Sequence, residues 1–369
     1  MKTAMPPDAK TTRMPSDAWG AIASAIAAAP GRTSADGQPV ELAHIDSPEL
    51  VFFAIHQGVA ALLDQRLADD AATGLSENSR RALRDEARRD AAMDLALNDT
   101  LQKCWQILKN NGIDALLLKG AALARTVYPH SRLRPRCDTD IWVRQSDAPR
   151  LIGTFRDAGY TLVNDDLETR SRKQFQATRE QFQGAALWFD VHHRLSNRLH
   201  FMDALDFDDC LGSAVPVTNP EQPPFDGTGT IAGQRMVTLS DPKQLLHLCI
   251  HRIAHGRNRE SQRLIWLYDI HLLFGQMSST GREGFLELAL SRGLGCICGD
   301  ALQACQDAFG LEINAMYLDA LTARRKQEPT ARLANASPWR WAWADFSGQS
   351  GWRAKWQFLA EVAHNRLRR

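Results

Sequence analysis

Apolar residues recur every three or four positions between residues 47 and 110, for example at Leu67 and Leu83. This spacing predicts helices, because residues three and four apart lie on one face of a helix. The pair Ser47-Pro48 predicts the start of the first of them, since serine caps a helix and proline suits its first turn. The chain therefore opens its ordered part with a helical region.

A different pattern follows, in which short apolar runs alternate with helix-like segments. The runs predict strands at Ile113–Leu118, Asp138–Val143 and Tyr160–Val163, with helices over 120–128 and 147–158 between them. Two further runs, residues 174–180 and 186–192, predict a hairpin that turns at Gln183-Gly184. Alternating strands and helices that end in a hairpin indicate a small mixed sheet with helices.

Helical spacing resumes at Ser240-Asp241-Pro242, a strong helix start, and continues to the end of the chain. The predicted fold class is therefore α+β: a small mixed sheet with helices, flanked by N-terminal and C-terminal helical regions. The expected division is a tail with one short helix (1–46), a helical region (47–110), the mixed core (111–211), a linker rich in proline and glycine (212–239) and a C-terminal helical domain (240–369).

Two aspartates, Asp138 and Asp140, open the second predicted strand. Side chains two residues apart on a strand point to the same face, and a rise of about 3.3 Å per residue places their stems roughly 6.6 Å apart. Their oxygens can therefore converge on one divalent cation or share a pair of cations. Thr139, between them, faces the other way.

Lys119 and Gly120 form a turn between the first predicted strand and the helix that follows it. Glycine lets the backbone approach a ligand closely, and a helix N-terminus favours an anion, so the turn is suited to a phosphate. A divalent cation that faces a phosphate indicates phosphoryl or nucleotidyl transfer.

The segment LLLKGAALARTVYPHSRLRPRCDTDIWV, residues 116–143, resembles the core motif of the uncharacterised nucleotidyltransferase family, a branch of the polymerase-β-like nucleotidyltransferase superfamily. Three later pieces resemble the same family: DAGY at 157–160, FDVHHRLS at 189–196 and LLHLCIHRIAHG at 245–256. The resemblance extends over about residues 45–275. It implies the nucleotidyltransferase fold and a Mg²⁺-dependent enzyme that uses an NTP.

The resemblance also implies a metal site made of Asp138, Asp140 and Asp190, with two Mg²⁺ ions expected. Asp190 lies in the apolar run ALWFDVHHR, where burying an unpaired carboxylate would cost several kcal/mol. A bound cation offsets that cost. The alternative is that these aspartates pair with Arg134, Arg136 or Arg194 in a dry network of ion pairs.

Most members of the superfamily carry Gly-Ser in the phosphate turn, whereas this chain has Lys119-Gly120-Ala121. We expect Lys119 to replace the missing hydroxyl with a charge, and the alternative is that it pairs with Asp138 or Asp140. Arg134 and Arg136 are further candidates for the triphosphate, because a guanidinium binds phosphate oxygens in a bidentate manner.

The expected reaction transfers a nucleoside monophosphate from an NTP to a hydroxyl or amine of an unidentified acceptor. Two alternatives stay open: a catalytically inactive protein that binds nucleotide or a partner on the same fold, and a toxin-like enzyme that modifies tRNA. The net charge of +1 makes a large tRNA footprint less favourable. ATP is a candidate nucleotide, but the sequence does not indicate which base the protein prefers.

His247, His251 and His255 lie four residues apart and share one helix face. Two of them could bind a metal together with Asp269 or His271. The alternative, which we favour, is that this face packs against the core.

Composition narrows the setting. Seven cysteines at irregular spacing do not predict a disulfide framework, and no apolar run reaches 18 residues, so we expect a cytoplasmic protein without a transmembrane helix.

Half of the ten tryptophans lie in the last 31 residues, next to the basic end Arg366-Leu367-Arg368-Arg369. This region is a candidate for contact with a partner or a membrane surface, or else a docked terminal helix.

Overall fold

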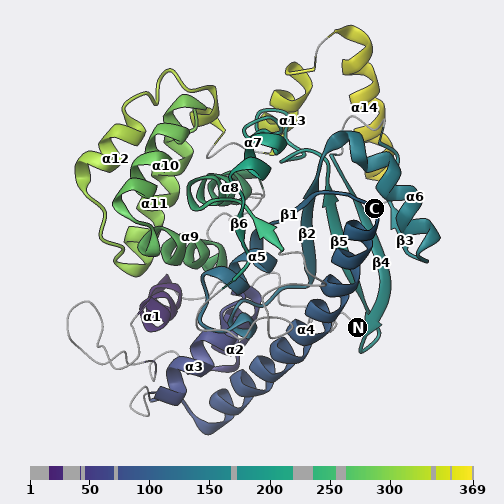
Figure 1. The fold of residues 1–369 in the computed structure, drawn as a ribbon. Coiled ribbons are helices and arrows are strands. Elements are labelled where there is room, and N and C mark those ends of the chain that lie inside the picture. The colour runs from purple at the N-terminus through teal and green to yellow at the C-terminus, as the bar shows by residue number, and fades with distance from the viewer. Residues whose placement is uncertain are drawn as a thin grey trace.

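The computed structural model describes residues 16–27, 42, 46–69, 74–167, 173–218, 236–254, 263–333, 338–349 and 351–367. It confirms the α+β fold class: a mixed seven-stranded sheet has helices before and after it in the chain (Figure 1). Most of the expected tail and linker (1–46 and 212–239) lies outside the described residues, as do His255, Arg368 and Arg369.

In the described part of the chain before the sheet, the helices are α1 (Ser16–Ala27), α2 (Pro48–Gln57), α3 (Ala60–Asp69) and α4 (Glu77–Asn110). Ser47 caps α2 as predicted, since its side chain accepts a hydrogen bond from the Leu50 amide. Ser76 caps α4 in the same way through the Ser79 amide. The long α4 runs along the sheet and contacts its strands (Figure 1).

The sheet has the strand order β3-β4-β5-β2-β1-β7-β6. Its strands are β1 (Ala115–Leu117), β2 (Asp138–Val143), β3 (Thr161–Val163), β4 (Gln174–Phe182), β5 (Ala185–His192), β6 (Val215–Pro216) and β7 (Val237–Thr238). The pairs β2–β5 and β1–β7 are parallel, and the other pairs are antiparallel. Helix α5 (Lys119–Thr126) connects β1 towards β2, and α6 (Ala148–Asp157) precedes β3.

The two faces of the central strands differ in chemistry. One face carries Leu117, Ile141, Phe189 and Val191, which pack with apolar side chains of α4 and α6 in one buried cluster. Because side chains alternate along a strand, the intervening residues of β2, β5 and β4 point to the opposite face. That face holds the polar side chains, including all three predicted metal ligands.

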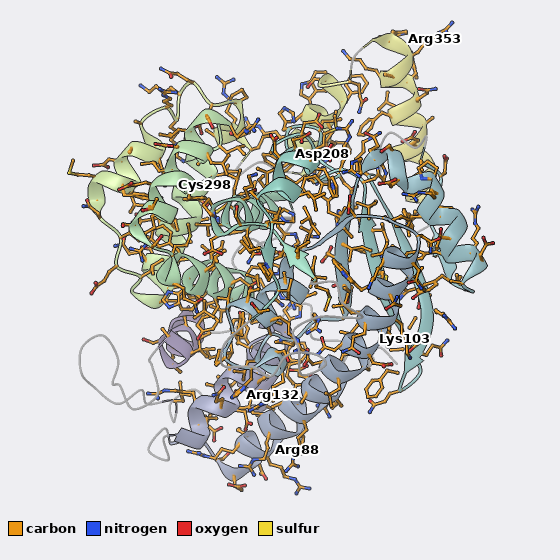
Figure 2. The ribbon with its side chains drawn as sticks, viewed as in Figure 1. Arg88, Lys103, Arg132, Asp208, Cys298 and Arg353 are labelled. Atoms are coloured by element: carbon orange, nitrogen blue, oxygen red, sulfur yellow. The ribbon has the colours of Figure 1, made fainter. Side chains whose placement is uncertain are left out.

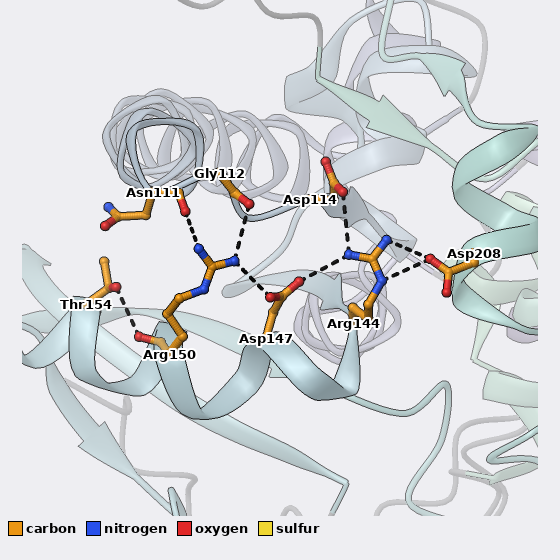
Figure 3. A network of polar contacts seen from close by, with 8 residues as sticks. All are labelled: Asn111, Gly112, Asp114, Arg144, Asp147, Arg150, Thr154 and Asp208. Carbon is orange, nitrogen blue, oxygen red and sulfur yellow. Dashed lines mark hydrogen bonds and ion pairs between the residues drawn. The ribbon is translucent and has the colours of Figure 1, made fainter.

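An ion-pair network holds the far end of β2 in place (Figure 3). Arg144, just after β2, forms ion pairs with Asp114, with Asp147 and with Asp208 of α7 (Phe207–Gly212). Arg150 of α6 donates to Asp147 and to the Asn111 carbonyl at the end of α4. These side chains are partly exposed, so each pair contributes about 0–1 kcal/mol. Together they fix the ends of four elements around β2.

The second helical region comprises α8 (Asp241–Ala254), α9 (Leu264–Gln276), α10 (Ser279–Ser291), α11 (Gly295–Phe309) and α12 (Ala315–Thr322), which share one large apolar core with α1–α3. Cys298 of α11 is buried in this bundle (Figure 2). Within the described residues every cysteine is free, and no helix is long and apolar enough to span a membrane.

The last two helices are α13 (Pro338–Ser347) and α14 (Trp352–Leu367). Trp341 is buried and packs against Phe201 and the Arg198 guanidinium in the segment after β5. Arg198 also forms an ion pair with Asp345. Helix α13 is therefore docked on the core. Four other tryptophans remain exposed: Trp339, Trp343, Trp352 and Trp356.

Candidate active site

Parallel pairing of β2 and β5 brings the three predicted aspartates together. Asp140 and Asp190 are direct partners in the register, and Asp138 lies two residues before Asp140. Partners in a sheet and residues two apart point to the same face, so all three carboxylates share one face. Asp140 is 7% exposed, and the other two are partly buried.

Asp140 is held by two side chains. Lys119 Nζ donates to Asp140 Oδ1 at 2.6 Å, and His192 Nε2 lies 2.8 Å from the same oxygen. Burial opposes the ionisation of Asp140, but the Lys119 charge and the His192 hydrogen bond outweigh it and hold the pKa of Asp140 well below its ordinary value. Asp140 is therefore ionised at any physiological pH.

Asp138 experiences the opposite effect. Burial, and then the negative charges of Asp140 and Asp190, raise the pKa of Asp138 to about 7. The charges of Lys119 and Arg134 only partly offset this rise. A carboxyl crowded by two others in a buried position is stabilised by a cation.

Asp190 is oriented by neutral amides. Gln176 Nε2 donates to Asp190 Oδ1 at 2.7 Å, and Gln174 Nε2 donates to Asp190 Oδ2 at 3.0 Å. Asn197 in turn donates to the Gln174 side-chain oxygen. Each carboxylate oxygen has a second lone pair. The amides therefore fix the direction of Asp190 and leave it able to bind a cation or a proton.

The turn after β1 is unusual in its backbone. Lys119 has a φ of 49°, in the left-handed region that residues other than glycine rarely adopt. It begins α5, and the residue before it, Leu118, provides no side-chain cap for the helix N-terminus. The first amides of α5 are thus left for another acceptor. From this left-handed backbone position, the Lys119 side chain reaches Asp140.

Arg134 is placed beneath this turn by a buried network. Its Nε and Nη2 donate to the two oxygens of Asp269 on α9, at 2.7 and 2.8 Å, and Tyr128 Oη donates to Asp269 at 2.7 Å. A Cβ on Gly120 would lie 3.3 Å from the Arg134 guanidinium. Glycine therefore allows the turn to rest directly on that guanidinium.

Arg136 and Arg194, the other arginines considered for the aspartates, also have partners of their own. Arg136 pairs with the buried Asp94 of α4 and donates to Asn98. Arg194 pairs with Asp203 in an exposed position. The alternative in which these arginines neutralise the three aspartates does not match the structure, whereas Lys119 does pair with Asp140.

The aspartate oxygens are the hard donors that Mg²⁺ prefers. Within the described ranges, no three histidine, cysteine, aspartate or glutamate side chains are already grouped as a metal site. Lys119 and His192 contact Asp140, and two amides contact Asp190. The donor chemistry of the three aspartates and their shared face of the sheet suit a magnesium ion.

The histidine-rich helix α8 lies apart from this chemistry. His247 is buried, and His251 packs edge-on against Trp266 at 4.8 Å. Asp269, considered as a partner for a metal there, is instead bonded to Arg134. His271 packs against aromatic rings, Tyr268 at 5.8 Å and Phe309 at 5.1 Å. In the structure, His251 and His271 thus contact aromatic side chains.

Sequence reasoning missed several residues that shape the site. Gln174 and Gln176 are two apart on β4, and that spacing could have placed both on the face of Asp190 once β4 was paired with β5. Asp94 and Asp269 have no such signal, because each lies in a helix far along the chain from its arginine.

A strand–turn–helix unit that faces three carboxylates on neighbouring strands is the site of a nucleotidyltransferase-like protein. A family model described as "Uncharacterised nucleotidyltransferase" matches residues 43–310, more than half of the 369-residue chain. The chain therefore belongs to this nucleotidyltransferase family. No curated protein matches it significantly.

Proposed function

We propose that the protein transfers a nucleoside monophosphate from an NTP to a hydroxyl or amine of an acceptor, in a Mg²⁺-dependent reaction. The observation that carries the proposal is the shared face of Asp138, Asp140 and Asp190, next to the turn of Lys119 and Gly120. Family membership supports nucleotidyl transfer in general.

In this reaction the acceptor atom forms a bond to the α-phosphorus, and the bond from that phosphorus to the bridging oxygen of pyrophosphate breaks. Asp138, Asp140 and Asp190 would hold Mg²⁺, which when bound would neutralise phosphate charge and lower the pKa of the acceptor group. Asp190, oriented by its two amides, accepts the proton of the acceptor.

The triphosphate lies against the N-terminus of α5. The backbone amides of Gly120 and Ala121 donate to its oxygens, and Lys119 supplies the charge that replaces the hydroxyl absent from this turn. Arg134, which lies against Gly120, adds positive potential at the turn while Asp269 holds it in place, and Arg136, held by Asp94, remains a second candidate for the triphosphate. The role of Arg134 is to support the turn from inside the protein.

A non-catalytic binding protein is the rival function, and two observations favour it. Ala121 follows Gly120 where most of the superfamily has a serine, and Lys119 already occupies an oxygen of Asp140. Such a protein would bind an NTP through the turn without transferring any part of it.

The decisive experiment incubates the purified full-length protein with each α-³²P-labelled NTP and Mg²⁺, alone and with cell extract, and searches for labelled macromolecules and small products. Asp190→Asn should abolish labelling, whereas Asp203→Asn, which alters an exposed aspartate, should not. Nucleotide binding without labelling under any condition would support the binding protein instead. Digestion of a labelled macromolecule with ribonuclease or protease then identifies an RNA or protein acceptor, and ribonuclease sensitivity tests the toxin-like alternative.

A further inference from the structure

Lys119 is directed into the carboxylate cluster by both its backbone and its surroundings. Its side chain is 14% exposed, and its Nζ lies 2.6 Å from Asp140 Oδ1 and 3.4 Å from His192 Nε2. The left-handed φ of 49° is unfavourable for a lysine, so surrounding contacts must maintain it. The turn is thus built to place an ammonium at this oxygen.

The contact saturates one oxygen of Asp140. A carboxylate oxygen has about two lone-pair sites, and Asp140 Oδ1 meets both Lys119 and His192. Within the described residues, Asp140 is the only one of the three aspartates that forms ion pairs. Asp138, Asp190 and the other oxygen of Asp140 are left to bind a cation.

In a two-metal site, both cations lie about 3.5–4 Å apart and share the aspartates that bridge them. A second divalent cation on the phosphate side of Asp140 would have to take the oxygen that Lys119 holds, because Lys119 belongs to the phosphate turn itself. Two cations cannot occupy that position together, since like charges repel strongly in a buried site.

We propose that the Lys119 ammonium permanently takes the place of the second divalent cation, so that the protein works with one Mg²⁺ ion. The ion binds to Asp138, Asp190 and the second oxygen of Asp140, and Lys119 bridges Asp140 and the triphosphate. This inference rests on the proposed function and replaces the expectation of two ions. It also explains how the turn operates without a serine hydroxyl.

The test counts bound Mn²⁺, a spectroscopically and analytically convenient substitute for Mg²⁺. The full-length protein is dialysed to equilibrium with Mn²⁺ and α,β-methylene-ATP, and then with the corresponding GTP, CTP and UTP analogues, which the enzyme cannot cleave. The ratio of protein-bound Mn²⁺ to bound nucleotide should be one for the wild type. It should double to two for Lys119→Met, in which the cation position becomes vacant.

Lys103→Met is the matched control. Lys103 lies on α4 and pairs at the surface with Asp99 and Glu180 (Figure 2), so its loss should leave the ratio at one. Lys119→Arg keeps the positive charge and should also remain at one. Near-ultraviolet circular dichroism checks that each variant is folded, and the wild-type ratio tests the inference even where Lys119→Met does not fold.

The outcomes separate this inference from the proposed function. A wild-type ratio of two, with Lys119 displaced when nucleotide binds, overturns the inference and leaves the proposed function standing. A ratio of one in both the wild type and a folded Lys119→Met also overturns the inference. Removal of the lysine would then not open a position for a second divalent cation. Nucleotide binding with no bound Mn²⁺ overturns the metal-dependent function as well.

Discussion

The buried ion pair between Arg134 and Asp269 joins the phosphate turn to the C-terminal helices, and Asp269→Asn is the change that tests it. Asparagine keeps the size of the side chain and an oxygen that can accept the hydrogen bond from the Tyr128 hydroxyl. The substitution removes the negative charge and replaces one of the two acceptor oxygens with an N–H donor, so one of the two Arg134 hydrogen bonds is lost as well. It leaves the Arg134 guanidinium buried, next to Gly120, without a counter-charge.

The magnitude follows from burial and geometry. Asp269 is 1% exposed and Arg134 is 8% exposed, and two parallel hydrogen bonds of 2.7 and 2.8 Å join them. Burial opposes the charge of Arg134, but Asp269 raises the pKa of Arg134 above its ordinary value. Because arginine cannot shed its proton, breaking the pair should lower the free energy of unfolding by about 3–5 kcal/mol.

Urea denaturation followed by tryptophan fluorescence measures this loss. The exposed pair Arg194–Asp203 provides the control, and Asp203→Asn should cost at most about 1 kcal/mol. Replacing both partners, as in Arg134→Met with Asp269→Leu, should recover most of the stability because no charge then remains buried. An Asp269→Asn variant within about 1 kcal/mol of the wild type would refute the reasoning.

Three further predictions concern single side chains. Lys119→Ala should lower kcat/KM for the NTP roughly ten- to a hundredfold, since a charge-assisted contact contributes about 1.5–3 kcal/mol, and steady-state kinetics would contradict this with a near-wild-type value. Gly120→Ala should weaken binding of an NTP analogue about tenfold in a calorimetric titration, because the new methyl group would lie 3.3 Å from the Arg134 guanidinium. Burial lowers the pKa of His271 to about 4 from 6.5, so protonation penalises the folded state increasingly as the pH falls from 6.5 towards 4, by at most about 3 kcal/mol. His271→Leu should reduce the loss of unfolding free energy between pH 7 and 4.5, as measured by denaturation curves. Identical pH profiles for the variant and the wild type would contradict this prediction.

Local patterns predicted the elements of the core well. The second strand has the predicted bounds, Asp138–Val143, and the hairpin turns where expected, at Gln183 and Gly184, with φ values of 50° and 80°. These features depend on neighbouring residues alone. The parallel pairing of β2 with β5, and of β1 with the two-residue β7, depends on contacts distant in the chain and has no local signal.

In the site, too, the features that depend on neighbouring residues were predictable, and those that depend on distant contacts were not. The alternation of side chains on a strand sufficed to place Asp138 and Asp140 on one face. The partner of Lys119 stayed open, because the answer depends on the left-handed backbone of one residue, which few lysines adopt. The partner of Arg134 could not be read at all, since 135 residues separate it from Asp269.

The acidic partners of the arginines determine the net charge on the polar face of the sheet. Arg134, Arg136 and Arg194 form their ion pairs with Asp269, Asp94 and Asp203, so none of the three pairs directly with the cluster, although the Arg134 charge partly offsets the raised pKa of Asp138. Three carboxylates then face one ammonium, which leaves two unbalanced negative charges when all three ionise. The pKa of Asp138, raised to about 7 by burial and by its two neighbours, is the result of that imbalance. One divalent cation carries the two positive charges that balance these two negative charges. The proposed single Mg²⁺ ion supplies them.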